Sequence, residues 1–345
     1  MADCNELFSL YNSAIKLSEE RRTILRAVRD NLRKKISNKF NELTFEESLE
    51  FHSQGSFVMD TIITPKDDDY DLDDGIYFKG NKSKVERPDS KNFHDAILYA
   101  VGEDESYAKV TDKDTCVRVR YDKEKFHIDL PIYYADAPDN PNLAHLVEFW
   151  PLSNPIEFID WFEGKVQSGF KMAFIFESRM FSDYQKWLSD IRKEDAQLRR
   201  IVRYLKGWAD ELRGEMPPGI VMTILAGENY IANQRDDLSL CYTLEAIKNF
   251  LLKNGFKCPR PTTPIGEDLF SSYSQTKKDY FMDRLTTFIK SANQAIESDI
   301  QKDACLKWQR HLGPRFSCAI ASDEIEGAEK FNQKPIIGST AKSAL

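Results

Sequence analysis

The amino-acid sequence predicts an α+β protein in which a mixed sheet precedes a helical lobe, with a cleft between the two. One apolar stripe marks a long helix near the N-terminus, and short alternating runs follow it. After Pro155, apolar residues recur at helical spacing. We therefore expect a first lobe over residues 1–160, a helical lobe over 161–332 and a flexible tail over 333–345.

The first lobe is predicted to begin with an amphipathic helix from Ser18 to about Phe40, because every third or fourth residue is apolar. Basic residues lie between these apolar positions. Strands are then predicted at Leu72–Phe78, Cys116–Tyr121 and Phe126–Tyr133, with a polar loop over Lys79–Ser90.

The second lobe shows three stretches of helical periodicity. They run from Tyr184 to Trp208, from Leu238 to Leu251 and from Tyr280 to Ala292. The connection Pro259–Gly266 holds three prolines and cannot be the interior of a helix. Residues 333–345 are mostly small or polar and offer too little apolar surface to offset the entropy of ordering.

Composition narrows the class of protein. The chain has 345 residues and a net charge of −8, which disfavours a protein that grips long nucleic acid. No apolar run approaches the roughly 20 residues that span a bilayer, and the N-terminus lacks a secretory signal, so we expect a cytoplasmic protein without membrane contact. The cysteines are scattered and include no CxxC pair, so buried thiols are expected rather than a disulfide framework or a structural zinc site.

Two aspartates stand out in the first predicted strand. Asp71 and Asp73 are two residues apart and therefore project from the same face. Adjacent carboxylates repel unless a cation lies between them, and Mg²⁺ is the natural occupant because it takes oxygen ligands and bridges carboxylates to phosphates. Asp129 lies at the centre of another strand that is otherwise mostly apolar, Phe126–Tyr133, on the face opposite its apolar residues. If the two strands are neighbours, the three carboxylates can hold two metal ions for an in-line phosphoryl displacement.

The segment Gln54-Gly55-Ser56 lies upstream of these strands. Glycine lets the backbone approach a phosphate closely, and a serine hydroxyl can bind phosphate oxygens. Two other interpretations of the acidic stretch were weighed. The run Asp67-Asp68-Asp69 is expected to be a solvated loop, and a calcium loop fails because its glycine and its bidentate glutamate are absent.

With these residues the chain resembles nucleotidyltransferases of the DNA polymerase β superfamily, and among them the cGAS/DncV-like enzymes of bacterial anti-phage (CBASS) defence, called CD-NTases. The resemblance rests on four segments and extends from the N-terminal helix to about residue 315. The segments are Gln54-Gly55-Ser56, Asp71-Leu72-Asp73-Asp74-Gly75, His127-Ile128-Asp129-Leu130-Pro131 and the predicted helix from Arg199 to Trp208.

The resemblance implies a polymerase-β-like catalytic core and a cyclic di- or trinucleotide made from NTPs such as ATP and GTP, in two rounds of transfer. It implies Asp71, Asp73 and Asp129 as catalytic metal ligands for two Mg²⁺ ions, and Mn²⁺ suits the same hard oxygen ligands. It further implies that Gln54, Gly55, Ser56, Arg118 and Lys206 bind nucleotide. A monomer is expected, and the tail is a possible handle for a partner resembling ubiquitin-conjugating enzymes.

Some alternatives stay open. Arg199, Arg203 and Lys206 share one helical face, which is either a phosphate-binding surface or a solvated basic face. Relatives often have serine where this chain has Pro218, and tyrosine where it has Met59, so the choice of base is not predicted. Other possible functions are a polynucleotide- or small-molecule-modifying nucleotidyltransferase, and a catalytically inactive nucleotide-binding scaffold.

Overall fold

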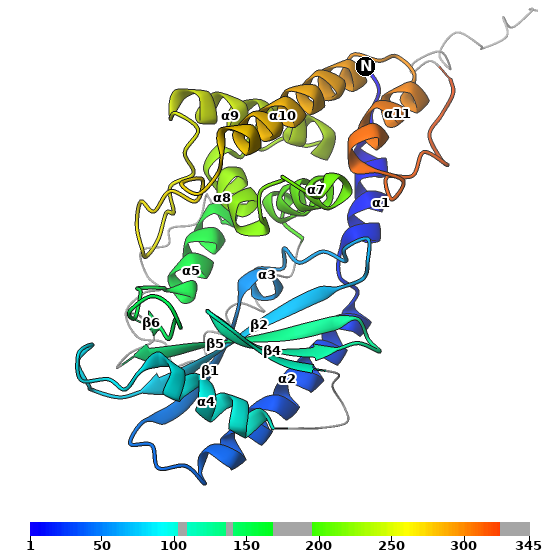
Figure 1. The fold of residues 1–345 in the computed structure, drawn as a ribbon. Helices are drawn as coiled ribbons and strands as arrows, with labels where there is room; N and C mark the ends of the chain where they lie inside the picture. The colour runs from blue at the N-terminus through cyan, green and yellow to red at the C-terminus, as the bar shows by residue number, and fades with distance from the viewer. Residues whose placement is uncertain (103–108, 136–140, 168–194, 325–345) are drawn as a thin grey trace, which may run out of the picture.

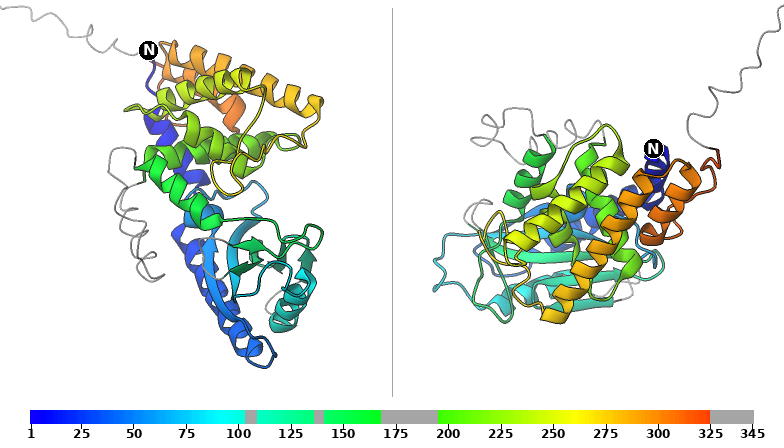
Figure 2. Two further views of the ribbon diagram at one scale, coloured as in Figure 1. Left: turned by 90° about the vertical axis from the view of Figure 1, so that its left-hand side faces the viewer. Right: turned by 90° about the horizontal axis from the view of Figure 1, so that it is seen from above.

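The computed structural model describes residues 1–102, 109–135, 141–167 and 195–324. A sheet with helices beneath it forms one half of the molecule, and a group of helices forms the other half (Figure 1). The view turned by 90° shows the same two halves stacked along the long direction of the molecule (Figure 2). The predicted α+β order, a mixed sheet followed by helices, is confirmed.

Within the described residues, six strands form one mixed sheet with the central order β1-β2-β5-β4-β3, and β6 pairs with β5. Strands β2 and β5 run parallel, and the other pairs are antiparallel. The three predicted strands are confirmed as β2, β4 and β5, whereas β1 and β3 carry too few apolar residues to be recognised from the sequence. The bounds are β1 Ser48–Gln54, β2 Tyr70–Lys79, β3 Lys109–Lys113, β4 Cys116–Tyr121, β5 Phe126–Ala135 and β6 Asn142–Leu143.

The helices fall into two groups. Those packed on the sheet are α2 Glu19–Phe40, α3 Gly55–Val58, α4 Ser90–Val101 and α5 Pro155–Val166. Those of the helical half are α1 Asn5–Ile15, α7 Gln197–Leu212, α8 Gly219–Asn229, α9 Asp236–Lys253, α10 Gln275–Ile296 and α11 Gln301–Leu312. None of the described helices is long and apolar enough to span a membrane.

Helix α2 matches its prediction, and its ends have local causes. The Ser18 side chain accepts a hydrogen bond from the backbone N–H of Arg21, and acidic residues fill the first turn, where they favour the helix dipole. The apolar stripe of α2 packs with α4 against one face of the sheet, where Phe40 and Phe93 both contact Phe78. The opposite face of the sheet is therefore the one that can carry a site.

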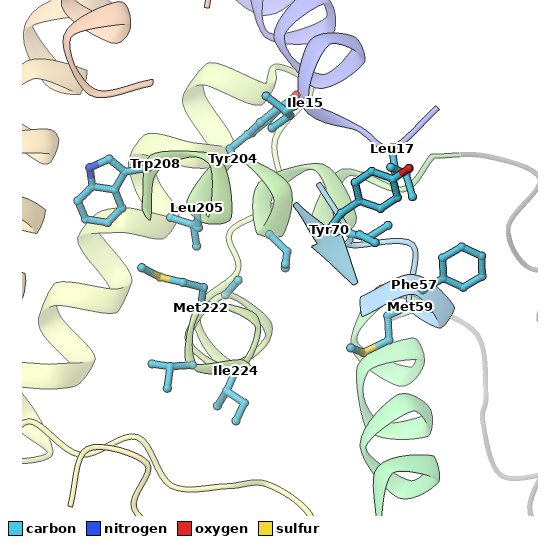
Figure 3. Close-up of a cluster of buried hydrophobic side chains, with 14 of the residues drawn as sticks. Ile15, Leu17, Phe57, Met59, Tyr70, Tyr204, Leu205, Trp208, Met222 and Ile224 are labelled. Carbon is cyan, nitrogen blue, oxygen red and sulfur yellow. The ribbon is translucent and has the colours of Figure 1, made fainter. Parts of the chain in front are cut away.

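A single apolar core joins the two halves. The buried side chains labelled in Figure 3 include Phe57 of α3 and Tyr70 of β2 on the sheet side. On the helical side they include Ile15 of α1, Leu205 of α7 and Met222 of α8. The N-terminal helix α1 packs in the helical half, because Phe8 contacts the rings of Trp308 and Phe316. The two lobes are thus held together by burial of apolar surface as well as by the chain connection.

The expectation that all six cysteines are thiols is wrong for two of them. Cys305 on α11 and Cys318 form a disulfide, with Cα atoms 5.8 Å apart. The chain turns back after α11 and brings residues 13 positions apart together, which scattered spacing did not reveal. The other four, Cys4, Cys116, Cys241 and Cys258, are buried thiols as expected. The predicted tail and the predicted helical residues Tyr184–Ile191 lie outside the described residues.

Candidate active site

A row of polar residues crosses the sheet on the face opposite α2 and α4. Gln54 on β1, Asp73 on β2, Asp129 on β5 and Arg118 on β4 are successive cross-strand partners. Partners directly opposite each other share a face, so these four side chains stand side by side. Asp71 precedes Asp73 by two residues on β2 and projects from the same face. The parallel pairing of β2 with β5 therefore brings together the three aspartates that the sequence analysis singled out.

A cavity of about 530 Å³ opens over part of this row. Its walls come from α3, β2, α5, α7, α8 and the loop that follows α9, so both halves of the molecule contribute. The lining includes most of the predicted site residues, namely Gln54, Gly55, Ser56, Asp71, Asp73 and Lys206.

The buried carboxyl of Asp73 is close to the like charges of Asp71 and Asp129. Burial, followed by the charges of Asp71 and Asp129, raises the pKa of its carboxyl well above the usual value. Gly55 lies directly against this carboxylate, because a Cβ atom at position 55 would overlap Asp73 Oδ2. The backbone of Gly55 has φ +68°, a left-handed conformation that glycine adopts readily. The Gly-Ser turn and the acidic strand are thus in contact.

Arg118 and Asp129 are paired with each other. Arg118 donates from Nε and Nη2 to the two carboxylate oxygens of Asp129, both at 2.6 Å. Neither residue is among those that line the cavity. Arg118 was predicted to contact nucleotide. In this structure it neutralises the charge of Asp129.

The donor set determines whether a metal ion fits. Among the described residues, no group of three His, Cys, Asp or Glu side chains is arranged as a ligand cluster. Asp71 and Asp73, however, are hard oxygen donors in the cavity wall, and their mutual repulsion is the kind that a divalent cation relieves. The pair fits Mg²⁺, whereas each carboxylate oxygen of Asp129 already accepts a hydrogen bond from Arg118.

Gln54 connects the Gly-Ser turn to the sheet. Its Nε2 donates to Tyr133 Oη at 3.0 Å. Its Oε1 is buried without a hydrogen-bond partner in the part of the chain that the structure describes. An unpaired buried acceptor beside a cavity is expected to find a donor when a ligand or ordered water is present.

Lys206 reaches the cavity from α7. Its Nζ donates to the backbone carbonyl of Thr61 at 3.1 Å and to Thr61 Oγ1 at 3.2 Å. Gly219 lies beside this side chain, since a Cβ there would be 3.2 Å from Lys206 Cε. Burial lowers the pKa of Lys206 to about 8, against the opposing pull of Asp71 and Asp73.

Two of the three cations on the basic face of α7 belong to neither a solvated surface nor the cavity wall. Arg199 and Arg203 are completely buried. Arg199 pairs with Glu163, and Arg203 donates to Asp195 at 2.6 Å, so they bind protein groups rather than solvent. Of the three cations, Lys206 alone lines the cavity. The sequence could not show this because the partners of the two arginines come from other segments.

Asp74 has a structural role that its neighbours do not share. Its side chain points to the opposite face of β2, where it is fully buried. Arg33 on α2 donates to it from Nε at 2.7 Å, and Ser53 Oγ donates at 2.8 Å. The third acidic residue of the motif therefore fixes α2 to the sheet.

Several residues of the cavity wall were not predicted from the sequence. Asp69, assigned to a solvated loop, lines the cavity and binds Arg120 at 2.9 Å and His127 at 3.2 Å. Tyr133, Asn154 and Arg260 also contribute. No local pattern marks these positions, because each comes from a different element.

Comparison with known proteins shows which proteins the sheet resembles. Residues 49–133, which contain β2, β3 and β4 and most of β1 and β5, match the family described as "Cyclic GMP-AMP synthase DncV-like, nucleotidyltransferase domain". Over this segment the chain is similar to the DncV-like nucleotidyltransferases.

Individual relatives are distant in sequence. The chain is 22% identical over 319 residues to a cyclic GMP-AMP synthase of Escherichia coli (strain TW11681), covering 83% of this chain and 72% of that protein. Vibrio cholerae DncV in its GTP-bound form has a TM-score of 0.71 at 19% identity, covering 91% of this chain and 96% of that chain. Escherichia coli DncV bound to 3'-deoxy GTP gives 0.65 at 20% identity, covering 88% and 93%. The DncV-like fold thus extends over both halves of this chain.

Proposed function

We propose that this protein is a cyclic oligonucleotide synthase that joins NTPs into a cyclic di- or trinucleotide. One observation carries the proposal: Gly55-Ser56, the pair Asp71 and Asp73, and Lys206 line one cavity between the two halves. A phosphate-binding turn, hard acidic ligands and a cation are the parts that nucleotidyl transfer needs. A Vibrio cholerae DncV structure, described as a cyclic AMP-GMP synthase with a linear pppApG intermediate, shares the fold at a TM-score of 0.69.

Each residue has a proposed role in the first transfer. Gly55 and Ser56 hold phosphate oxygens of the donor, and Lys206 binds its triphosphate. Asp71 and Asp73, together with Asp129, would hold two Mg²⁺ ions, for which Mn²⁺ would substitute. The bound ions supply charge stabilisation of the triphosphate and lower the pKa of the attacking hydroxyl.

Ring closure repeats this chemistry in the same cavity. A hydroxyl oxygen of the acceptor attacks the α-phosphorus of the donor, and pyrophosphate leaves. The linear product then rebinds, and its free hydroxyl attacks its own 5' α-phosphorus with loss of a second pyrophosphate. Asn154, Arg260 and Tyr133 line the same cavity and are available to hold the acceptor.

The proposed setting is anti-phage signalling in the cytoplasm by a monomeric enzyme. The net charge of −8 agrees with small phosphorylated substrates rather than long nucleic acid. A role for residues 333–345 as a handle for a partner of the ubiquitin-conjugating type belongs to the same proposal, and these residues lie outside the described part of the chain.

The purified full chain tests the proposal directly. We expect incubation with Mg²⁺ and the four NTPs to give a product that resists phosphatase, because a ring has no terminal phosphate. Mass spectrometry of that product then identifies its bases and ring size. Extension of an added polynucleotide, or transfer of one NMP to a small molecule, would favour another nucleotidyltransferase activity. Absence of any product would favour the inactive scaffold.

The charge of Lys206 is expected to make NTP binding pH-dependent. Because burial lowers its pKa to about 8, the side chain loses its charge as the pH rises from 7 to 9, and affinity for the triphosphate should fall. Lys206→Ala should weaken binding at pH 7 by about 10- to 100-fold, the range for a hydrogen bond to a charged group, and remove this pH dependence.

Lys206→Arg is the matched control, because an arginine stays charged over the whole range. Titration with a non-hydrolysable ATP analogue at pH 7, 8 and 9 measures the dissociation constant of wild type, Lys206→Ala and Lys206→Arg. The assigned role is wrong if wild type and Lys206→Ala have the same dissociation constant at pH 7.

A further inference from the structure

The segment that follows Ser56 is bound by cations along its backbone. Arg199 Nε donates to the carbonyl of Met59 at 3.3 Å, and Arg203 Nη1 donates to that of Asp60 at 2.5 Å. Lys206 Nζ donates to the carbonyl of Thr61 at 3.1 Å. Three successive carbonyls are therefore bound by one face of α7, whose cations are spaced four and three residues apart.

The two arginines are themselves fixed. Arg199 forms a buried ion pair with Glu163 on α5. Arg203 donates from Nε to Asn12 Oδ1 at 2.8 Å and from Nη2 to Asp195 at 2.6 Å. Both guanidinium groups are completely buried, so neither can change partners without breaking other contacts. They form a rigid link from α7 to the carbonyls.

Residues 55–61 need such support. Gly55 and Asp60 both have positive φ, +68° and 54°, and such conformations persist where surrounding contacts fix them. The Asp60 side chain also forms two ion pairs, with Arg22 at 3.0 Å and with Lys16 at 3.1 Å. The turn closes on itself where the backbone N–H groups of Thr61 and Ile62 donate to the Ser56 carbonyl, at 3.0 and 3.1 Å.

We propose that Arg199 and Arg203 are positioning residues that set the Gly55-Ser56 turn relative to Lys206. Lys206 lies on the same helical face as the two arginines and donates to the next carbonyl in the same row. The Gly55-Ser56 turn and Lys206 are proposed to hold the two ends of one triphosphate. Contacts with the single helix α7 therefore fix the distance between them. The kinetic consequence rests on the proposed function, whereas the positioning itself is a property of the free protein.

Arg203→Lys tests the proposal, because lysine keeps the charge but cannot reproduce the three-directional contacts of the guanidinium. Arg200→Lys is the matched control. Arg200 is also on α7 and also forms a bidentate pair, with Asp236 at 2.6 and 2.7 Å, but its hydrogen bonds within the described residues go to Asp236 and Asp195 and not to residues 55–61. Loss of helix anchoring alone would affect both variants alike.

We expect Arg203→Lys to raise the KM for NTP by about 10- to 100-fold relative to Arg200→Lys, as for a misplaced reactant-binding group. Both variants are assayed at a temperature where circular dichroism shows each to be folded. If Arg203→Lys does not fold, Arg199→Lys replaces it, since lysine lacks the planar guanidinium whose separate nitrogens bond Glu163 and the Met59 carbonyl.

Hydrogen exchange gives a readout that does not depend on catalysis. We expect the amides of Thr61 and Ile62 to exchange faster in Arg203→Lys than in Arg200→Lys, with the β2 and β5 amides unchanged. If wild type turns over no NTP but the exchange difference appears, the proposed function fails and the positioning stands. If KM and exchange are the same in both variants, the positioning proposal is overturned.

Discussion

Asp73→Asn is expected to lower the rate of product formation by about 10³-fold or more, because a lost metal ligand removes several kcal/mol of charge stabilisation. Asp71→Asn should have a similar effect, since both carboxylates line the cavity. Initial rates with mixed NTPs and Mg²⁺ measure the loss. Asp67→Asn is the control, because Asp67 is largely exposed, binds Arg213 and does not line the cavity. Near wild-type rates in either active-site variant would remove Asp71 and Asp73 from the proposed mechanism.

The same substitution should affect stability in the opposite direction. The raised pKa of Asp73 means that folding favours its protonated form. Its contribution to stability is therefore complete below the unfolded value of 3.8 and is lost as the pH rises through the higher folded value. At pH 7 without metal, Asp73→Asn should thus have a higher Tm than wild type.

Mg²⁺ provides the complementary measurement. A cation that binds the folded site stabilises wild type by mass action, and should raise the Tm of Asp73→Asn less. Thermal unfolding with Mg²⁺ and with EDTA measures both effects without any turnover. An equal Mg²⁺ response in the two proteins would show that the ion binds elsewhere.

The parts of the site that depend on local periodicity were predictable. Alternation along a strand placed Asp71 and Asp73 on one face and marked Asp129 as anomalous in an apolar strand. The three aspartates come together because β2 pairs with β5 in parallel, and neither segment alone predicts that pairing. The three-carboxylate site was predicted on the condition that these two strands are neighbours. The structure meets this condition, because Asp73 and Asp129 are directly paired.

Residues whose partners are remote in sequence were not predictable. The spacing of charges along α7 predicted that Arg199, Arg203 and Lys206 share one face of the helix. It did not predict which groups that face contacts. The carbonyls that bind the two arginines lie 140 and 143 residues away along the chain. Such contacts are set by the packing of α7 on the sheet half. The Asp74 contact with α2 and the pairing of Cys305 with Cys318 also depend on how the chain packs in three dimensions, which no local pattern records.

The link between α7 and residues 59–61 bears on how the two halves act together. A shift of α7 relative to the sheet would move the carbonyls of the Gly-Ser segment with it. Because Lys206 lies on the same helix, it would move in the same direction. The geometry across the cavity is therefore expected to be retained when the two halves shift, provided that the arginines keep their partners.

Gly55→Ala is the second substitution with a large expected effect. A Cβ at this position overlaps Asp73 Oδ2, so the carboxylate or the turn must move. Product formation should fall by about 10²-fold or more, since displacement of a reacting group by 1 Å has an effect of that size. The variant should also be less stable, because alanine at φ +68° carries a left-handed strain of roughly 1–2 kcal/mol.

Gly255→Ala separates the two causes. Gly255 has φ +60°, close to that of Gly55, but a Cβ there meets no atom within 4 Å. It should therefore show the backbone strain in urea unfolding and keep its activity. The excess loss of activity in Gly55→Ala then reports the contact with Asp73 alone. Equal activity in the two variants would mean that the turn does not control the position of this carboxylate. A greater loss in Gly55→Ala, together with a weaker Mg²⁺ effect on its Tm, would place that control at the metal ligand itself.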